Sequence, residues 1–158
     1  MFDYFEKEIG IYILREPITI QINDKILMIG HGDGLGPGDL KYKFIKKFFT
    51  NRFCQWVFSK IHPNISFFIA RYWSRKSKEN EKHGSPPFLG EDKEWLIQYC
   101  KEQLLLNDKI NYFIFGHRHL PIEHKINNGC YYINLGDWVE HFTYALLENN
   151  KLKLKKFD

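Results

Sequence analysis

The sequence has few cysteines and no long uninterrupted run of apolar residues. Its three cysteines, Cys54, Cys100 and Cys130, are widely spaced and form no CxxC pair, which argues against a disulfide framework and favours buried thiols in a reducing compartment. No stretch approaches the roughly 18 apolar residues that a membrane-spanning helix requires. The start of the chain also lacks the basic and apolar regions of a secretory signal. We therefore expect a cytoplasmic protein that does not cross a membrane.

The length and composition favour one folded domain. The chain has 158 residues, of which 44% are hydrophobic and 27% charged, and its mean hydropathy is −0.44. A chain of this size holds one hydrophobic core, and this balance argues against disorder. We expect a single domain over residues 1–158.

Positive charge and aromatic residues gather in one segment. Between Lys41 and Lys82 there are eleven basic and two acidic residues, whereas the remainder carries twelve basic and seventeen acidic residues. Eleven aromatic residues are interleaved with this charge: Tyr42, Phe44, Phe48, Phe49, Phe53, Trp56, Phe58, Phe67, Phe68, Tyr72 and Trp73. Such a mixture suits anionic headgroups and acyl chains at a membrane surface, and the alternative is a solvated basic face over an aromatic core. Nucleic acid is not expected, because no recognisable RNA- or DNA-binding module surrounds the charge.

The hydrophobic pattern predicts an α/β protein. Two or three short strands are expected between residues 11 and 29, of which the last, 25–30, opens into a glycine-rich loop over 31–39. Residues 40–79 predict at least two helices, with breaks at His62-Pro63 and around Ser74, and residues 91–106 predict an amphipathic helix. A buried strand over 111–115 then runs into residues 116–119. Antiparallel strands are expected over 125–127, 131–135, 142–147 and 152–156.

Three histidines lie where predicted strands end. His31 follows one strand, and His117 and His119 follow another at a spacing of two, so that all three imidazoles can converge. Neutral imidazole is a common ligand of transition metals, and a carboxylate behind it normally fixes its orientation. We therefore predict His31, His117 and His119 as metal ligands, with Asp33 and Asp137 as the supporting carboxylates. The other four histidines, His62, His83, His124 and His141, are interpreted as ordinary surface or hydrogen-bonded residues.

These motifs together resemble a known superfamily. Gly30-His31-Gly32-Asp33 after one strand, Phe115-Gly116-His117-Arg118-His119 after another, and then Asn134-Leu135-Gly136-Asp137-Trp138 closely resemble the last blocks of the calcineurin-like metallophosphoesterases. Within that superfamily the chain looks most like the UDP-2,3-diacylglucosamine hydrolases of lipid A synthesis. The likeness covers almost the whole chain.

The resemblance implies a fold, a cofactor and a reaction. The fold would be the C-terminal portion of a metallophosphoesterase-type αββα sandwich, with residues 40–83 inserted as a helical cap. His31 and His117 would hold one ion and His119 the other of a pair of divalent metals, Mn²⁺ in this branch, that clamp a phosphate and activate a water. The complete protein would cleave UDP-2,3-diacylglucosamine to UMP and 2,3-diacylglucosamine 1-phosphate at the inner membrane. By the same analogy Ser74, Arg75, Lys76 and Lys78 would contact this glycolipid substrate.

The early blocks of the family do not occur in this sequence. Its Asp-x-His pair and its Asn-His-Asp segment are not found, nor is the carboxylate that bridges the two metals, so no catalytic residue is identified in the chain. We expect a fragment, or a chain whose missing N-terminal half comes from another polypeptide, and we expect it to be inactive alone. Two alternatives remain open: a phosphoesterase of a soluble nucleotide or phosphoprotein, and a noncatalytic fragment that binds a membrane or a partner.

Overall fold

The computed structural model describes residues 4–37, 40–81 and 87–157, except for the side chains of 41–42 and 77–81. Its helices are α2 (Leu40–Thr50), α3 (Arg52–Ser59), α4 (Pro63–Glu81) and α5 (Trp95–Leu106). Its strands are β1 (Ile18–Ile22), β2 (Lys25–Ile29), β3 (Tyr112–Phe115), β4 (Pro121–Lys125), β5 (Tyr131–Leu135), β6 (Thr143–Glu148) and β7 (Lys151–Lys156). Short helical turns lie at Phe5–Ile9 and Glu91–Lys93.

The described strands form a five-stranded mixed sheet and a two-stranded sheet. The first has the order β1-β2-β3-β5-β4, and β6 pairs with β7 in the second. Strands β2, β3 and β5 run parallel to one another, while β1 and β4 are antiparallel at the two edges. The carboxyl ends of β2, β3 and β5 therefore lie next to one another along the same side of the sheet, where these strands end.

Both faces of the central strand β3 are covered, and its four residues are all buried. Phe113 and Phe115 pack in the cluster that contains Leu96, Ile97 and Cys100 of α5. Tyr112 and Ile114 pack in the cluster formed with β6 and β7, which includes Leu152. Because successive strand side chains point to opposite faces, an unbroken apolar strand fits this position between a helix and a second sheet.

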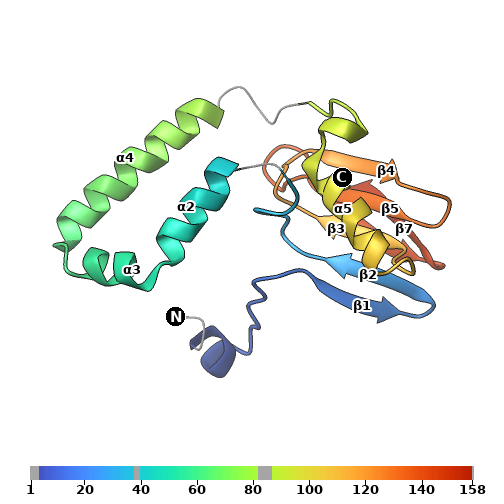
Figure 1. Ribbon diagram of the computed structural model, residues 1–158, viewed down its shortest axis with the longest axis horizontal. Helices are drawn as coiled ribbons and strands as arrows, with labels where there is room; N and C mark the ends of the chain where they lie inside the picture. Colours follow the sequence, from blue (N-terminus) through green and yellow to red (C-terminus); the bar gives the residue numbers. More distant parts are fainter. Residues whose placement is uncertain (1–3, 38–39, 82–86, 158) are drawn as a thin grey trace.

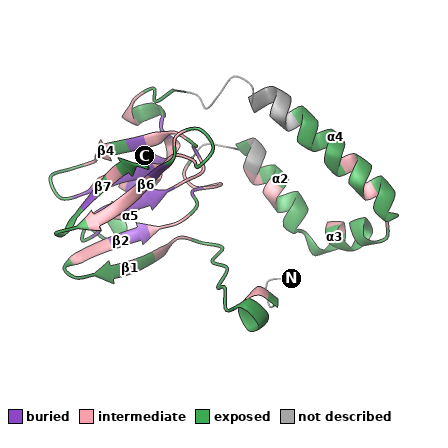
Figure 2. Cartoon of the chain, turned by 180° about the vertical axis from the view of Figure 1, so that it is seen from behind, coloured by how far each residue is buried: buried purple, intermediate pink, exposed green. Residues whose placement is uncertain are grey.

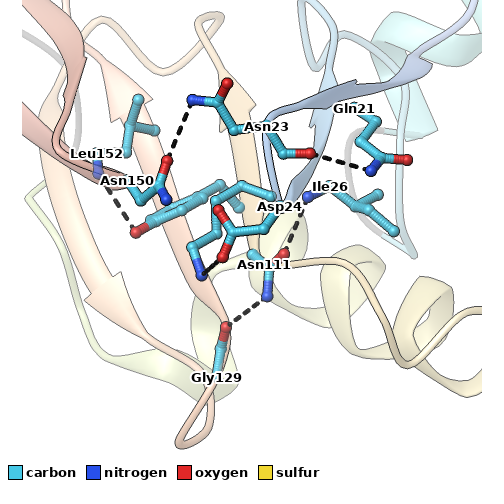
Figure 3. Close-up of polar contacts among 10 residues, drawn as sticks. Gln21, Asn23, Asp24, Ile26, Asn111, Gly129, Asn150 and Leu152 are labelled. Carbon is cyan, nitrogen blue, oxygen red and sulfur yellow. Dashed lines mark hydrogen bonds and ion pairs between the residues drawn. The ribbon is translucent and has the colours of Figure 1, made fainter.

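Polar side chains tie the strands together at the end where β2 and β3 begin (Figure 3). Asn111 Oδ1 accepts a hydrogen bond from the Ile26 N–H at 2.9 Å, and Asn111 Nδ2 donates to the Gly129 carbonyl at 3.4 Å. The Leu152 N–H donates to the Tyr112 hydroxyl at 3.3 Å, which joins the second sheet to the first. These contacts fix where the parallel strands start, and so fix which residues follow their far ends.

Helices α2, α3 and α4 project away from the sheets, and we call this segment, residues 40–81, the helical arm (Figure 1). Its described side chains are largely exposed (Figure 2), and α3 contains no buried residue. Exposed apolar side chains of the arm include Phe44, Phe48, Phe53, Trp56, Phe67, Phe68, Tyr72 and Trp73. None of the described helices is long and apolar enough to cross a bilayer.

The predicted α/β class is confirmed, and the helix start at Pro63 is confirmed because proline fits the first turn of a helix. The predicted break around Ser74 is wrong: α4 continues from Pro63 to Glu81, since none of the residues around Ser74 breaks a helix. Residues 11–14 form no strand, although their apolar pattern predicted one. Strand β4 begins at Pro121, four residues before the expected start, because proline is tolerated at the first position of an edge strand. The expected antiparallel pairing is confirmed for β4 with β5 and for β6 with β7. The strands do not form one meander, because β5 also pairs parallel to β3 and β6 belongs to the second sheet.

Candidate metal centre

His31 and His117 lie side by side just beyond the ends of β2 and β3. The backbone continues the parallel pairing past both strands: the Gly30 N–H donates to the Ile114 carbonyl at 3.1 Å, and the Gly116 N–H donates to the His31 carbonyl at 3.0 Å. The centroids of the two imidazole rings are 5.4 Å apart, with an interplanar angle of 79°. Two residues 86 positions apart in sequence thus present their rings to one another, as their strand-end positions predict.

The backbone after β3 directs alternate side chains to opposite sides. His117, His119 and His31 line one cleft of about 620 Å³ between the two sheets, which we call the histidine cleft. Arg118, between the two histidines, is instead buried and pairs with Glu94, the residue before α5. His117 and His119 both have φ of +50°, a left-handed conformation that is uncommon for residues other than glycine and that surrounding contacts must hold in place.

Asn134 on β5 supports the turn that carries the histidines. Its side chain is fully buried, and its Nδ2 donates both to the Gly116 carbonyl and to the Tyr132 hydroxyl, the latter at 3.2 Å. The Gly136 N–H in turn donates to Asn134 Oδ1 at 3.3 Å. The amide therefore links the end of β5 to the residue that precedes His117.

The carboxylate of Asp33 pairs with a lysine of the helical arm. Lys46 Nζ lies 2.9 Å from Asp33 Oδ2, and Lys43 Nζ donates to the Gly36 carbonyl in the same loop. Asp33 and Lys46 line a second hollow of about 330 Å³ that also includes His31, Arg15 and Glu16. The loop after β2 therefore connects the predicted metal ligand to the arm.

Asp137 lines the histidine cleft, but its hydrogen bonds lie within its own turn. Its Oδ1 accepts from the backbone N–H groups of Val139, Glu140 and His141, and its Oδ2 lies 2.9 Å from His141 Nδ1. The Glu140 N–H, followed by the His141 side chain, holds the pKa of Asp137 well below its usual value. The described contacts of Asp137 thus support His141, a histidine that sequence analysis had set aside, rather than one of the three predicted ligands.

The predicted substrate-contact residues lie elsewhere. Ser74, Arg75 and Lys76 are exposed on α4, and none of them is among the described residues that line the histidine cleft or the hollow beside Asp33. The side chain of Lys78 lies outside the described residues. The expected cap boundary at residue 83 lies outside them as well.

The chemistry of the site fits part of a metal centre. Imidazoles are ligands suited to divalent transition metals, and His31, His117 and His119 share one cleft. Among the described residues, however, no group of three or more His, Cys, Asp or Glu side chains is placed to hold an ion. The histidines of this chain therefore fit one side of a coordination shell, and further donors are needed to complete it.

Sequence analysis missed the polar contacts behind these loops. The pairs Lys46–Asp33 and Arg118–Glu94, and the Asn134 amide, all support residues next to the histidines. The sequence offered one signal, a charged residue, Arg118, between two predicted ligands: if both imidazoles share one side of the chain, the residue between them faces the other. Its partner could not be found from sequence spacing.

Comparison with known proteins identifies relatives of the whole chain. No family model matches the sequence. The UDP-2,3-diacylglucosamine hydrolase of Porphyromonas gingivalis is 27% identical over 173 residues, which cover 99% of this chain and 64% of the relative. The proteins of the same name from Shewanella piezotolerans and Histophilus somni strain 129Pt are 24% and 27% identical, and the alignments cover 95% and 85% of this chain.

The chain spans less than two thirds of each of these relatives, namely 64%, 61% and 56% of their lengths. That extent agrees with a chain that corresponds to one part of a longer hydrolase. The resemblance to the metallophosphoesterases, and within them to the UDP-2,3-diacylglucosamine hydrolases, is thereby confirmed over nearly the whole chain.

Proposed function

We propose that this chain is the histidine-bearing part of a metal-dependent hydrolase of phosphate esters or pyrophosphates. The observation that carries the proposal is the placement of His31 and His117, whose rings lie 5.4 Å apart at the ends of neighbouring parallel strands. His119 lines the same cleft. Ligand clusters at the carboxyl ends of parallel strands are a general feature of α/β enzymes.

In this proposal His31 and His117 hold one divalent ion and His119 the other, with Mn²⁺ as the metal. When bound, two such ions supply the positive charge that clamps a phosphate and acidifies a water. Asn134 and Arg118 keep the loop after β3 in place, and Lys46 holds Asp33 beside His31. The remaining ligands and the catalytic groups come from the part of the relatives that this chain does not span.

The proposed substrate is UDP-2,3-diacylglucosamine, cleaved to UMP and 2,3-diacylglucosamine 1-phosphate. The names of the relatives and the exposed aromatic and basic surface of the arm support it. Ser74, Arg75, Lys76 and Lys78 remain the proposed substrate contacts, with residues 40–83 as a cap over the lipid. A cytoplasmic protein bound to the inner membrane would meet this substrate at the membrane surface.

The proposal is tested by UMP release in the presence of Mn²⁺. The 158-residue chain and the same chain extended by the coding sequence upstream of Met1 are compared on UDP-2,3-diacylglucosamine and on a water-soluble phosphodiester. We expect hydrolysis by the extended chain, loss of at least about 100-fold in kcat/KM when His117 is changed to Asn, and no turnover by the short chain. Preference for the soluble ester would overturn the lipid substrate, and no turnover by either chain would overturn the hydrolase.

A further inference from the structure

The side chain of Arg118 is held on the face of its loop opposite to the histidines. It is 7% exposed, its Nε lies 3.1 Å from Glu94 Oε2, and its guanidinium sits over the Trp95 ring at 5.1 Å from the ring centroid. A planar guanidinium held by a carboxylate on one edge and by an aromatic face has little freedom to rotate. The backbone on either side of Arg118, which carries His117 and His119, is restrained with it.

Glu94 is an unusual partner, because it is the residue just before a helix. It is the N-cap residue of α5: its carbonyl accepts the N–H groups of Ile97 and Gln98, but its side chain makes no capping hydrogen bond. Its carboxylate is 2% exposed and turned to Arg118, and within the described part of the chain its Oε1 has no hydrogen-bond partner. Buried ion pairs with unmet polar atoms contribute little to stability compared with an apolar pair of similar size. The pair is therefore better suited to fixing geometry than to stabilising the core.

The loop after β2 packs on the same turn of α5. A Cβ at Gly32 would lie 3.3 Å from a Leu96 methyl and 3.4 Å from the Cβ of His117, and a Cβ at Gly36 would overlap the Trp95 carbonyl oxygen. Both glycines have positive φ, +104° and +69°, which other residues rarely adopt. The loop that carries His31 thus lies directly on Trp95 and Leu96, beside the residue that holds Arg118.

We propose that residues 94–96, the N-cap and the first residues of α5, are a clamp that sets the distance between the two histidine loops. Glu94 and Arg118 are positioning residues: they act through the backbone of residues 116–119 on the spacing of His31 and His117. The effect on metal binding rests on the proposed function, whereas the effect on ring spacing does not.

Two measurements test the clamp. The first is the proton–proton Overhauser contact between the His31 and His117 rings in the metal-free, isotope-labelled 158-residue chain. The second is the affinity for Mn²⁺ of the chain extended upstream of Met1, followed by electron paramagnetic resonance. Glu94→Gln keeps the shape of the side chain and removes its charge, and Arg118→Gln removes the cation, whereas Arg118→Lys keeps it.

We expect Glu94→Gln and Arg118→Gln to weaken the ring contact and to lower the Mn²⁺ affinity by about 10- to 100-fold, with partial recovery in Arg118→Lys. The matched control is Glu91→Gln. It removes a carboxylate three positions before Glu94 that pairs with Lys101 at 2.6 Å, and both measurements should stay at their wild-type values. A purely structural role would lower the melting temperature and leave the ring contact unchanged.

The clamp is overturned if the ring contact in folded Glu94→Gln and Arg118→Gln equals that of the wild type. If the arginine variants fail to fold, the ring contact in Glu94→Gln alone tests the clamp. An upstream-extended wild-type chain that binds no Mn²⁺ would count against the proposed function, and the ring contact would still decide the clamp.

Discussion

Left-handed backbone occurs at several positions of the histidine loops. His117, His119, Gly32 and Gly36 all have positive φ. For residues other than glycine this conformation costs of order 1 to 3 kcal/mol, so surrounding contacts must enforce it. The Asn134 amide and the buried Arg118 supply such contacts.

Substitution by alanine should destabilise the protein more at Gly36 than at Gly10, although the two glycines have nearly the same φ. Gly36 and Gly10 have φ of +69° and +70°, but a Cβ at Gly36 would overlap the Trp95 carbonyl, whereas a Cβ at Gly10 would meet nothing within 4 Å. We expect Gly36→Ala to lower the free energy of unfolding by about 2 to 4 kcal/mol, since backbone strain and overpacking add. Gly10→Ala should cost about 1 kcal/mol from strain alone. Urea denaturation measures both, and equal losses would contradict the close approach of the loop to α5.

The Asp137 turn should make stability depend on pH in the acid range. The folded-state pKa of Asp137 is lowered from 3.8 by the Glu140 N–H and then by the His141 side chain. A carboxyl group with a lowered folded-state pKa contributes stability above its unfolded pKa, and that contribution is lost as the pH falls through the folded value. We expect wild type to exceed Asp137→Asn in unfolding free energy at pH 6, and the difference to shrink steadily below pH ~3.8. A difference that stays constant from pH 6 to pH ~2.5 would show that the charge of Asp137 contributes nothing.

Among the elements, the helices of the arm and the strands of the sheets are stabilised differently. Strand β3 is buried on both faces, while α3 contains no buried residue and depends on its own capping. Asn51 is the N-cap of α3, and its Oδ1 accepts the N–H groups of Phe53 and Cys54 at 2.9 and 3.2 Å. Stability should therefore vary along the chain, with α3 opening more readily than the sheet.

Removing this cap should act locally. We expect Asn51→Ala to destabilise α3 by about 1 kcal/mol and so to speed amide hydrogen exchange across residues 52–59 by about fivefold. Exchange in β3 should be unchanged. Asn51→Asp, which keeps the acceptor and adds favourable charge at the helix start, is the control and should exchange as slowly as wild type. Faster exchange in both variants would show that the cap does not hold the helix.

The sequence predicted those features that depend on local patterns. Hydrophobic periodicity predicted a strand over 111–115 and a helix over 91–106, and the structure has β3 from Tyr112 and α5 from Trp95, after a separate turn at Glu91–Lys93. The placement of His31 and His117 at strand ends follows from the same pattern. The Asp137–His141 contact spans four residues and could also have been anticipated. The pairs Lys46–Asp33 and Arg118–Glu94 join residues 13 and 24 positions apart across loops, so they depend on how the arm and α5 are oriented, which no spacing reveals.

For the molecule as a whole, charge and exposed aromatic residues coincide on the arm. Eleven of the 23 basic residues lie between positions 41 and 82, with only two acids among them. Aromatic side chains such as Phe44, Phe67 and Phe68 are more than two thirds exposed there. Exposed patches of this kind mark surfaces that contact a membrane or another molecule.

We expect the chain to bind vesicles that contain phosphatidylglycerol and to bind phosphatidylcholine vesicles weakly. Each basic residue near an anionic surface contributes about 1 kcal/mol, and salt screens that attraction. Sedimentation of the protein with vesicles at rising NaCl concentration measures the effect. A double variant of the arm, Arg71→Gln with Arg75→Gln, should bind more weakly, whereas Lys153→Gln with Lys155→Gln in β7 serves as a charge-matched control. Equal binding to both vesicle types would contradict an electrostatic contribution of the arm.

The alternation along β3 has a consequence that reaches past the strand. Within the strand, Phe113 and Phe115 face α5, whereas Tyr112 and Ile114 face the second sheet. Beyond Gly116 this assignment inverts, so that His117 and His119 line the cleft and Arg118 takes the helix side. Loss of one residue before Gly116 would therefore exchange the contents of both cores at once. Loss of one residue after Gly116 would leave both cores intact and would place the Arg118 guanidinium where an imidazole now lies.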